Sequence, residues 1–256
     1  LPGSVFTASH NPSGYNGNKF CFSEARPDRS DTGIEEIRDE VLSKMISGDG
    51  SGSISQLNLL EEFANHVKSF VDTDKLKPLR VVADTANGMG GLVVPAVFQE
   101  LPFQIEIMYQ DLDGTFPNHP ADPIQPENLV DLQKRVLETN ADIGLAFDGD
   151  ADRVFLVDEK AQPVSGSVTT ALVAKKVLNE EPGATIVHNL ICSQIVPETI
   201  AQMGGRAVRT RVGHSYIKKI MAEEQAAFGG EHSGHYYFRD NFRADSGLIA
   251  ALIVLE

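Results

Sequence analysis

The chain has 256 residues, of which 41% are hydrophobic and 23% charged, a composition typical of a globular protein that buries more than one core. Its formal net charge of −14 argues against nucleic acid as a partner, because a phosphate backbone is bound by a surplus of Lys and Arg. No apolar run approaches the roughly 20 residues that cross a bilayer, so we expect a soluble, cytoplasmic protein without a membrane partner.

The first 52 residues predict the end of a domain rather than a complete one. They contain a strand-like stretch and a polar loop, but they are too short and too polar to form a core alone. The chain begins with Leu1 rather than Met, which suggests part of a longer polypeptide. Residues 47–55 are rich in Gly, Ser and Asp, which favours a flexible linker or a tight hairpin. We therefore assign 1–52 to the C-terminal part of a first domain.

Residues 53–162 predict a second domain of alternating strands and helices. Apolar runs of strand length alternate with stretches of helical period, the pattern of layered α/β domains. The expected strands are 80–83, 104–109, 143–147 and 154–157, and the expected helices lie around 93–98 and 129–137. Asn128 precedes the second helix and can cap it. The glycines at 88, 90 and 91 do not have the GxGxxG spacing of a dinucleotide site, so we interpret them as a turn between strand and helix.

A boundary near Pro163 opens a third domain, residues 163–256, with the same alternation. The expected helices are 168–178, 193–203, 215–224 and 246–256, and the expected strands are 185–188 and 207–211. The chain has two cysteines, Cys21 and Cys192, each in an apolar stretch, and we predict both to be buried free thiols.

The loop after the first strand-like stretch carries a candidate nucleophile, Ser9. Stiffened by Pro12 and Gly14, the loop should expose this serine to attack a substrate or to carry phosphate. Adjacent residues of an extended chain point to opposite sides, so His10 is poorly placed to deprotonate Ser9. On spacing alone, a turn closed by an Asx-type hydrogen bond from Asn11 is the alternative.

An acidic loop between the strands at 143–147 and 154–157 predicts a metal site. Asp148, Asp150 and Asp152 repel one another unless a cation lies among them, and ligation by oxygen alone favours Mg²⁺ or Ca²⁺ over zinc. An EF-hand is disfavoured, although Glu159 falls at its twelfth position, because Arg153 stands where its loop needs Gly and the flanks are strand-like. A solvated acidic turn without metal is the open alternative.

Residues 229–235 alternate glycines with Glu231, His232, Ser233 and His235, which suits recognition of sugar hydroxyls. Zinc would need a further soft ligand close by, and the neighbouring sequence offers none.

Residues 212–215 open a helix that contains Lys218 and Lys219. Free N–H groups at a helix start favour an anion, and His214 could contact a phosphate or hydroxyl. The alternative is structural, with Ser215 as an N-cap and Gly213 turning the chain.

In this order, the motifs resemble those of the α-D-phosphohexomutase superfamily over nearly the whole chain: TASHNPSGYNGNK, DGTFPNHPADP, DGDADR and GEHSGH. The last is closest to the phosphomannomutase and phosphoglucomutase branch, since phosphoglucosamine mutases generally carry Gln where this chain has His232. The resemblance implies tandem three-layer α/β domains with mixed sheets flanked by helices, four in all around a cleft. The fourth domain, which grips the distal phosphate, has no counterpart here, so the isolated chain should be inactive.

The resemblance also implies the activity: interconversion of hexose 6-phosphate and hexose 1-phosphate, of mannose, glucose or both, through a bisphosphorylated sugar. Phosphate carried on Ser9 would complete a Mg²⁺ shell of Asp148, Asp150 and Asp152, and glucose or mannose 1,6-bisphosphate would act as activator. The implied catalytic residues are Ser9, His10, Lys19, Arg153 and His235, with Lys19 exchanging a proton if its neighbours lower its pKa. The implied substrate contacts are His214, Glu231 and Ser233. Ile191 departs from the family, because many relatives have Lys there.

Three other functions are alternatives to this mutase activity. A phosphoglucosamine mutase is the alternative among the enzymes of the same family. A metal-dependent sugar-phosphate binding protein would keep the loops without turnover, but the intact Ser9 and aspartates argue against it. A phosphatase of the aspartyl-phosphate type fits Asp148 and Asp150, yet it also needs a downstream pair of hydroxyls.

Overall fold

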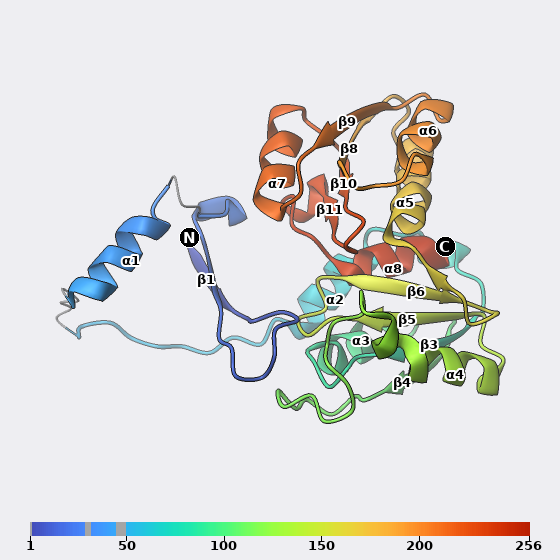
Figure 1. The fold of residues 1–256 in the computed structure, drawn as a ribbon, viewed down its shortest axis with the longest axis horizontal. Coiled ribbons are helices and arrows are strands. Elements are labelled where there is room, and N and C mark those ends of the chain that lie inside the picture. Colours follow the sequence, from blue (N-terminus) through green and yellow to red (C-terminus); the bar gives the residue numbers. More distant parts are fainter. Residues whose placement is uncertain (1, 29–31, 45–49) are drawn as a thin grey trace.

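The computed structural model describes residues 2–28, 32–44 and 50–256. In this part of the chain, two α/β units lie against each other, and a hairpin reaches toward them from the N-terminal side (Figure 1). Among the described residues, no helix combines the length and the apolar character needed to span a membrane.

The first unit is built on a five-stranded mixed sheet. Strand alternation divides its apolar side chains between two faces, with Val154 and Leu156 in one core cluster and Phe155 and Val157 in another. Neighbours β4, β3 and β5 run parallel, while β6 and β7 are antiparallel additions. In spatial order the strands are β4 (Gln104–Met108), β3 (Arg80–Asp84), β5 (Ile143–Phe147), β6 (Val154–Asp158) and β7 (Pro163–Val164).

Helices cover both faces of this sheet. Helix α4 (Val130–Thr139) packs Leu132 and Val136 against one face. Helices α2 (Leu60–Lys68) and α3 (Gly90–Phe98) contribute Val67, Val94 and Val97 to the core on the other face. Three layers result, and the loops that follow β3 and β5 lie side by side because these strands are parallel neighbours.

The second unit has a four-stranded sheet with the same layering. Helix α7 (His214–Glu223) packs Ile217 and Met221 on one face. Helices α5 (Gly166–Glu180) and α6 (Ile195–Gln202) cover the other. The strands are β11 (Tyr236–Phe238), β10 (Phe228–Gly230), β8 (Thr185–Asn189) and β9 (Arg206–Thr210), of which only β11 is antiparallel to its neighbour.

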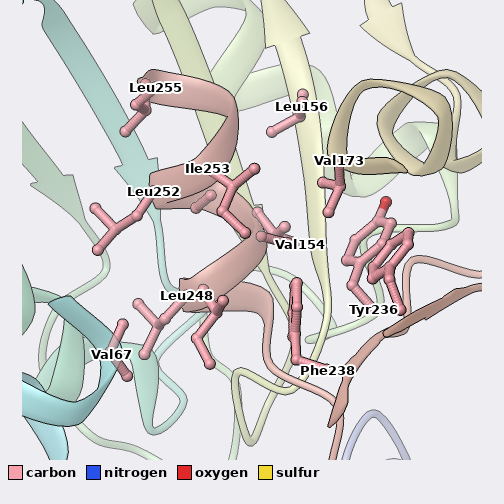
Figure 2. Packing of buried hydrophobic residues seen from close by; sticks show 14 of the residues in the cluster. Val67, Val154, Leu156, Val173, Tyr236, Phe238, Leu248, Leu252, Ile253 and Leu255 are labelled. Atoms are coloured by element: carbon pink, nitrogen blue, oxygen red, sulfur yellow. The ribbon is translucent and has the colours of Figure 1, made fainter. Parts of the chain in front are cut away.

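Helix α8 (Gly247–Leu255) belongs to the core of both units. Its sequence is apolar all round, as expected of a helix without a solvent face. Figure 2 shows Leu248 beside Val67 of α2, Leu252 one turn further along the helix, and Ile253 turned toward Val154 of β6. Val173 of α5 and aromatic side chains of β11 lie in the same cluster, so one continuous core joins the two sheets.

The N-terminal segment has no such core. Strands β1 (Gly3–Phe6) and β2 (Asn18–Cys21) form an antiparallel hairpin, followed by the 3-10 turn η1 (Ser23–Ala25) and by α1 (Ile34–Ser43), which buries none of its residues. Residues 50–59 form neither helix nor strand and lead back to α2. Short 3-10 turns complete the fold: η2 (Thr73–Lys75), η3 (Pro126–Leu129) and η4 (Arg239–Asn241).

The fold confirms the expected class, tandem α/β/α layers with mixed sheets, and corrects local details. Asn128 does not cap α4, because the helix starts two residues later and the Asn128 amide donates to the Asp122 carbonyl at 2.8 Å. Cys21 and Cys192 are free thiols but only half-buried. The predicted linker at 47–55 lies partly outside the described residues, and the boundaries near 52 and 163 remain predictions.

Candidate active site

The serine loop and the acidic loop meet at the end of β5. Ser9 Oγ donates to Asp148 Oδ2 at 3.0 Å, and Thr7 Oγ1 donates to Asp150 Oδ2 at 2.8 Å. Gly149 permits this approach, because a Cβ at that position would collide with the Ser9 carbonyl oxygen. The structure thus brings together two loops that the sequence separates by 139 positions.

Ser9 adopts a left-handed backbone conformation, with φ of 53°. Its N–H donates to Thr7 Oγ1 at 2.8 Å, and the turn is closed by the Asn11 N–H on the Ala8 carbonyl at 3.0 Å. This turn corrects the expectation for His10, whose Nδ1 lies 3.2 Å from Ser9 Oγ, because neighbouring side chains point apart only in an extended chain. Burial, then the charge of Arg153, lowers the pKa of His10, which favours the neutral ring.

The three aspartates form a compact oxygen cluster, with one oxygen from each within 4.8 Å of the others. Asp148 is fully buried, and burial raises its pKa against the pull of Arg153. Burial, followed by the nearby carboxylates of Asp245, Asp148 and Asp150, raises the pKa of Asp152 to about 7. In the described part of the chain, Oδ1 of Asp150 and Oδ1 of Asp152 are buried without a hydrogen-bond partner. This donor set fits a hard divalent cation, whereas the flanking strands β5 and β6 do not fit an EF-hand.

Two cationic side chains neutralise part of this cluster. Arg153, almost fully buried, donates from Nε to Asp148 Oδ2 at 2.9 Å and from its backbone N–H to Asp148 Oδ1 at 3.1 Å. Lys19 Nζ lies 3.3 Å from Asp152 and 3.5 Å from Asp150. Burial opposes the charge of Lys19, but the two carboxylates outweigh it and raise its pKa. The condition that its neighbours lower this pKa is therefore not met here.

His235 lies beside the acidic loop and is held by a residue that the sequence analysis missed. Its Nδ1 is 2.8 Å from Asp245 Oδ2 and 3.7 Å from Asp152 Oδ1. Lys218 Nζ contacts the other Asp245 oxygen at 3.1 Å. Burial opposes protonation of His235, yet the Asp245 carboxylate outweighs it and raises the pKa. The sequence gives no sign of this pair, because His235 precedes β11 and Asp245 follows the turn after that strand, and only the folded turn brings them together.

Glu231 is a buried anchor in this structure, 2% exposed. Its Oε1 accepts from Asn189 Nδ2 at 3.1 Å and from the Gly213 N–H at 3.2 Å, and its Oε2 accepts from the Tyr237 hydroxyl at 2.8 Å. The carboxylate therefore ties the start of α7 to β8 and β11. Its expected contact with a sugar hydroxyl remains a prediction.

The start of α7 differs from the alternative in which Ser215 caps the helix. Gly213, with φ of 126°, is the N-cap, so Ser215 lies inside the helix and His214 is its first residue. Burial, then Lys218, lowers the pKa of His214, and the charges of Lys19 and His235 act on it too. Ser233 is half-buried in its loop.

Comparison with known proteins places both units. Residues 61–162 match the family model for phosphoglucomutase/phosphomannomutase, alpha/beta/alpha domain II, and residues 165–256 match domain III. Over 99% of its length the chain is 38% identical to phosphohexose mutases of Xanthomonas campestris and 37% identical to a phosphomannomutase of Escherichia coli, and it spans 57% and 58% of their lengths. A crystal structure of a phosphoglucomutase/phosphomannomutase family protein from Burkholderia thailandensis superposes with a TM-score of 0.88 at 31% identity, over 99% of this chain and 55% of that one.

Proposed function

The chain belongs to the α-D-phosphohexomutase superfamily, and we propose that the whole protein interconverts hexose 6-phosphates and hexose 1-phosphates, of mannose, glucose or both. The observation that carries the proposal is the contact of Ser9 Oγ with Asp148 at 3.0 Å. A hydroxyl so close to a cluster of cation-binding oxygens is placed to accept and return a phosphoryl group.

In this proposal Asp148, Asp150 and Asp152 would hold Mg²⁺ beside the phosphate carried on Ser9. A bound Mg²⁺ ion supplies neutralisation of the phosphate charge. Arg153 opposes the rise in the pKa of Asp148 that burial causes, and it holds the carboxylate in place through two hydrogen bonds. The neutral ring of His10, whose Nδ1 lies 3.2 Å from Ser9 Oγ, steadies the serine and can donate a hydrogen bond to its oxygen while the hydroxyl donates to Asp148.

Proton transfer to and from the sugar hydroxyls falls to Lys19 and His235. Each lies against the acidic loop, and each carries its proton because carboxylates outweigh burial. A protonated group next to the reacting oxygen can act as the general acid, and its conjugate base then serves the reverse step. His214, Glu231 and Ser233 are proposed to contact the sugar phosphate. The 1,6-bisphosphate formed after the first transfer must turn over before its other phosphate returns to Ser9.

Intact-mass analysis of the full-length protein tests the proposal. After incubation with Mg²⁺ and glucose or mannose 1,6-bisphosphate, we expect one added phosphate, which Ser9→Ala abolishes. Ser4→Ala is the matched control, because within the described residues the Ser4 hydroxyl donates to the exposed Asn18 side chain of its own hairpin, and the variant should retain the phosphate. An unchanged mass of the parent protein, or labelling that survives in Ser9→Ala, contradicts the assignment.

A coupled assay with mannose, glucose and glucosamine phosphates identifies the sugar. Turnover of glucosamine phosphate alone would support the phosphoglucosamine mutase alternative. The 256-residue chain by itself should show no turnover, and a cytoplasmic location stays an expectation.

A further inference from the structure

A histidine outside the proposed site links two loops that support the acidic cluster. His119 lies in the proline-rich loop between β4 and η3. Its Nε2 is 3.0 Å from Oδ2 of Asp84, the last residue of β3, and its Nδ1 is 2.9 Å from the Pro120 carbonyl oxygen. Asp84 is 1% exposed and the His119 side chain 13%, so water competes little for the bond to Asp84, whereas the bond to the Pro120 carbonyl is exposed.

Both contacts require the ring to donate. A carbonyl oxygen only accepts, and so does an ionised carboxylate, so a ring that donates to both of these acceptors carries hydrogen on both nitrogens and is an imidazolium. The other Asp84 oxygen accepts the Ala86 N–H at 2.9 Å.

The charged and titratable groups that face this ring favour its charge. Asp84 faces it from β3, and Asp131 of α4 acts through Tyr109, whose ring stands edge-on at 5.4 Å and whose hydroxyl donates to Asp131 at 2.8 Å. Burial, then Asp131, raises the pKa of Tyr109 to about 12, so this neighbour is neutral. Burial opposes protonation of His119, but Asp84 outweighs it and raises the pKa.

The turn after Asp84 leads directly to the acidic loop. The Met89 N–H donates to the Gly149 carbonyl at 2.9 Å, and Gly88 packs so closely on Gly149 that a Cβ would lie 2.6 Å from its carbonyl oxygen. Any displacement of this turn moves the backbone between Asp148 and Asp150.

The proline-rich loop leads to the same place from the other side. Ala121 packs near Gly149, and Asp122 forms an ion pair with Arg153 at 3.9 Å. Arg153 in turn holds Asp148. The two supports of the acidic loop are therefore joined to each other at His119 and Asp84.

We propose that His119, as an imidazolium bridging Asp84 and the Pro120 carbonyl, is a positioning residue that fixes the acidic loop in its cation-binding geometry. Loss of the proton removes one of the two N–H donors of the ring, so the proline-rich loop is no longer bonded to the turn after β3. Gly149 and Arg153, which these two segments contact, then become less firmly positioned. The inference depends on the proposed function only in treating the three aspartates as a metal site.

Nuclear magnetic resonance of the chain with ¹⁵N-labelled histidine tests the charge directly. A histidine with the ordinary pKa loses its proton around pH 6.5. We expect both ring nitrogens of His119, assigned by their loss in His119→Gln, to keep the shifts of a protonated ring to a higher pH than this. A His119 ring that loses its proton at or below about pH 6.5 overturns the proposal, whether or not any variant folds.

Titration of the chain with Mn²⁺, followed by electron paramagnetic resonance, tests the consequence. His119→Gln should weaken binding on the order of tenfold, the lower end for groups outside the ligand set, and the gap should narrow as pH rises through the pKa of His119. Tyr109→Phe is the control: it keeps the ring beside His119, deletes only the bond to Asp131 and should bind like the parent. Equal affinity of the parent and His119→Gln refutes the positioning role alone, whereas a parent that binds no Mn²⁺ contradicts the metal site itself.

Discussion

Replacing Gly149 with Ala tests whether the serine and acidic loops depend on close backbone contact. A Cβ at this position would lie 3.2 Å from the carbonyl carbon of Ser9 and closer still to its oxygen. Restoring an ordinary carbon–oxygen contact requires a shift of roughly 1 Å, since non-bonded atoms prefer about 3.5–4.0 Å. We expect the shift to separate Ser9 from Asp148, because the collision lies between the two loops that their hydrogen bond joins.

The expected loss follows from that displacement. Overpacking of this kind costs about 1–3 kcal/mol of stability. A misplacement of about 1 Å at a reacting centre can slow turnover by about 100-fold. We therefore expect full-length Gly149→Ala to fold, to unfold at lower urea concentration than the parent, and to lose most of its phosphorylation on Ser9 at a fixed time.

Gly114→Ala provides the matched control, because a Cβ there meets no atom within 4 Å in the described part of the chain. Urea unfolding followed by circular dichroism gives the stability, and intact mass after a timed incubation with the sugar bisphosphate gives the phosphorylation rate. If Gly149→Ala matches Gly114→Ala in both measurements, the close approach of the loops plays no part in the site.

Three further results are expected. Asp150→Asn removes one of three anionic oxygen donors and should weaken Mn²⁺ binding by at least about tenfold, so an unchanged paramagnetic titration would contradict the metal assignment. Glu231→Gln places a donor among groups that themselves donate and should lower the free energy of unfolding by about 1–3 kcal/mol, while the exposed Glu223→Gln should not. The folded-state pKa of His119 is raised, so the ion pair of His119 with Asp84 contributes its full stabilisation below the unfolded-state pKa of about 6.5. This stabilisation is lost as the pH rises through the folded-state pKa. The urea midpoint of the parent should fall over this pH range, and that of His119→Gln should not.

Local patterns sufficed for the layered fold and for the acidic loop. The strands flanking Asp148 to Asp152 contain the apolar runs IGLAF and VFLV, so both the sheet and the position of the aspartates at its edge follow from the length of these runs. Strand β10 escaped prediction because it has three residues, two of them glycines, which give no alternation. Asn128 was assigned a cap by its position before the helix, but the 3-10 turn η3 places the helix start beyond it.

Long-range partners could not be read from spacing. The meeting of Ser9 with Asp148 was expected only through resemblance to a family, since nothing in the local sequence joins the two loops. The prediction that His10 points away from Ser9 was wrong because Ser9 adopts a left-handed conformation, and no glycine at that position indicates such a turn. Asp245 and Asp84 act through histidines on other segments, and such pairs become visible only when the chain is folded.

The apolar helix α8 makes the two sheets inseparable. A fragment that ends at residue 162 would expose Val154 and Leu156, because it lacks α8. A fragment that begins at residue 163 would contain α8 but not the strands and helices of the first unit that bury one of its sides. Two fragments divided at that junction should therefore expose apolar surface, fold poorly and aggregate. In the intact chain, heating should unfold both sheets in a single cooperative step. The acidic loop on one sheet and His235 beside the other then keep a fixed separation.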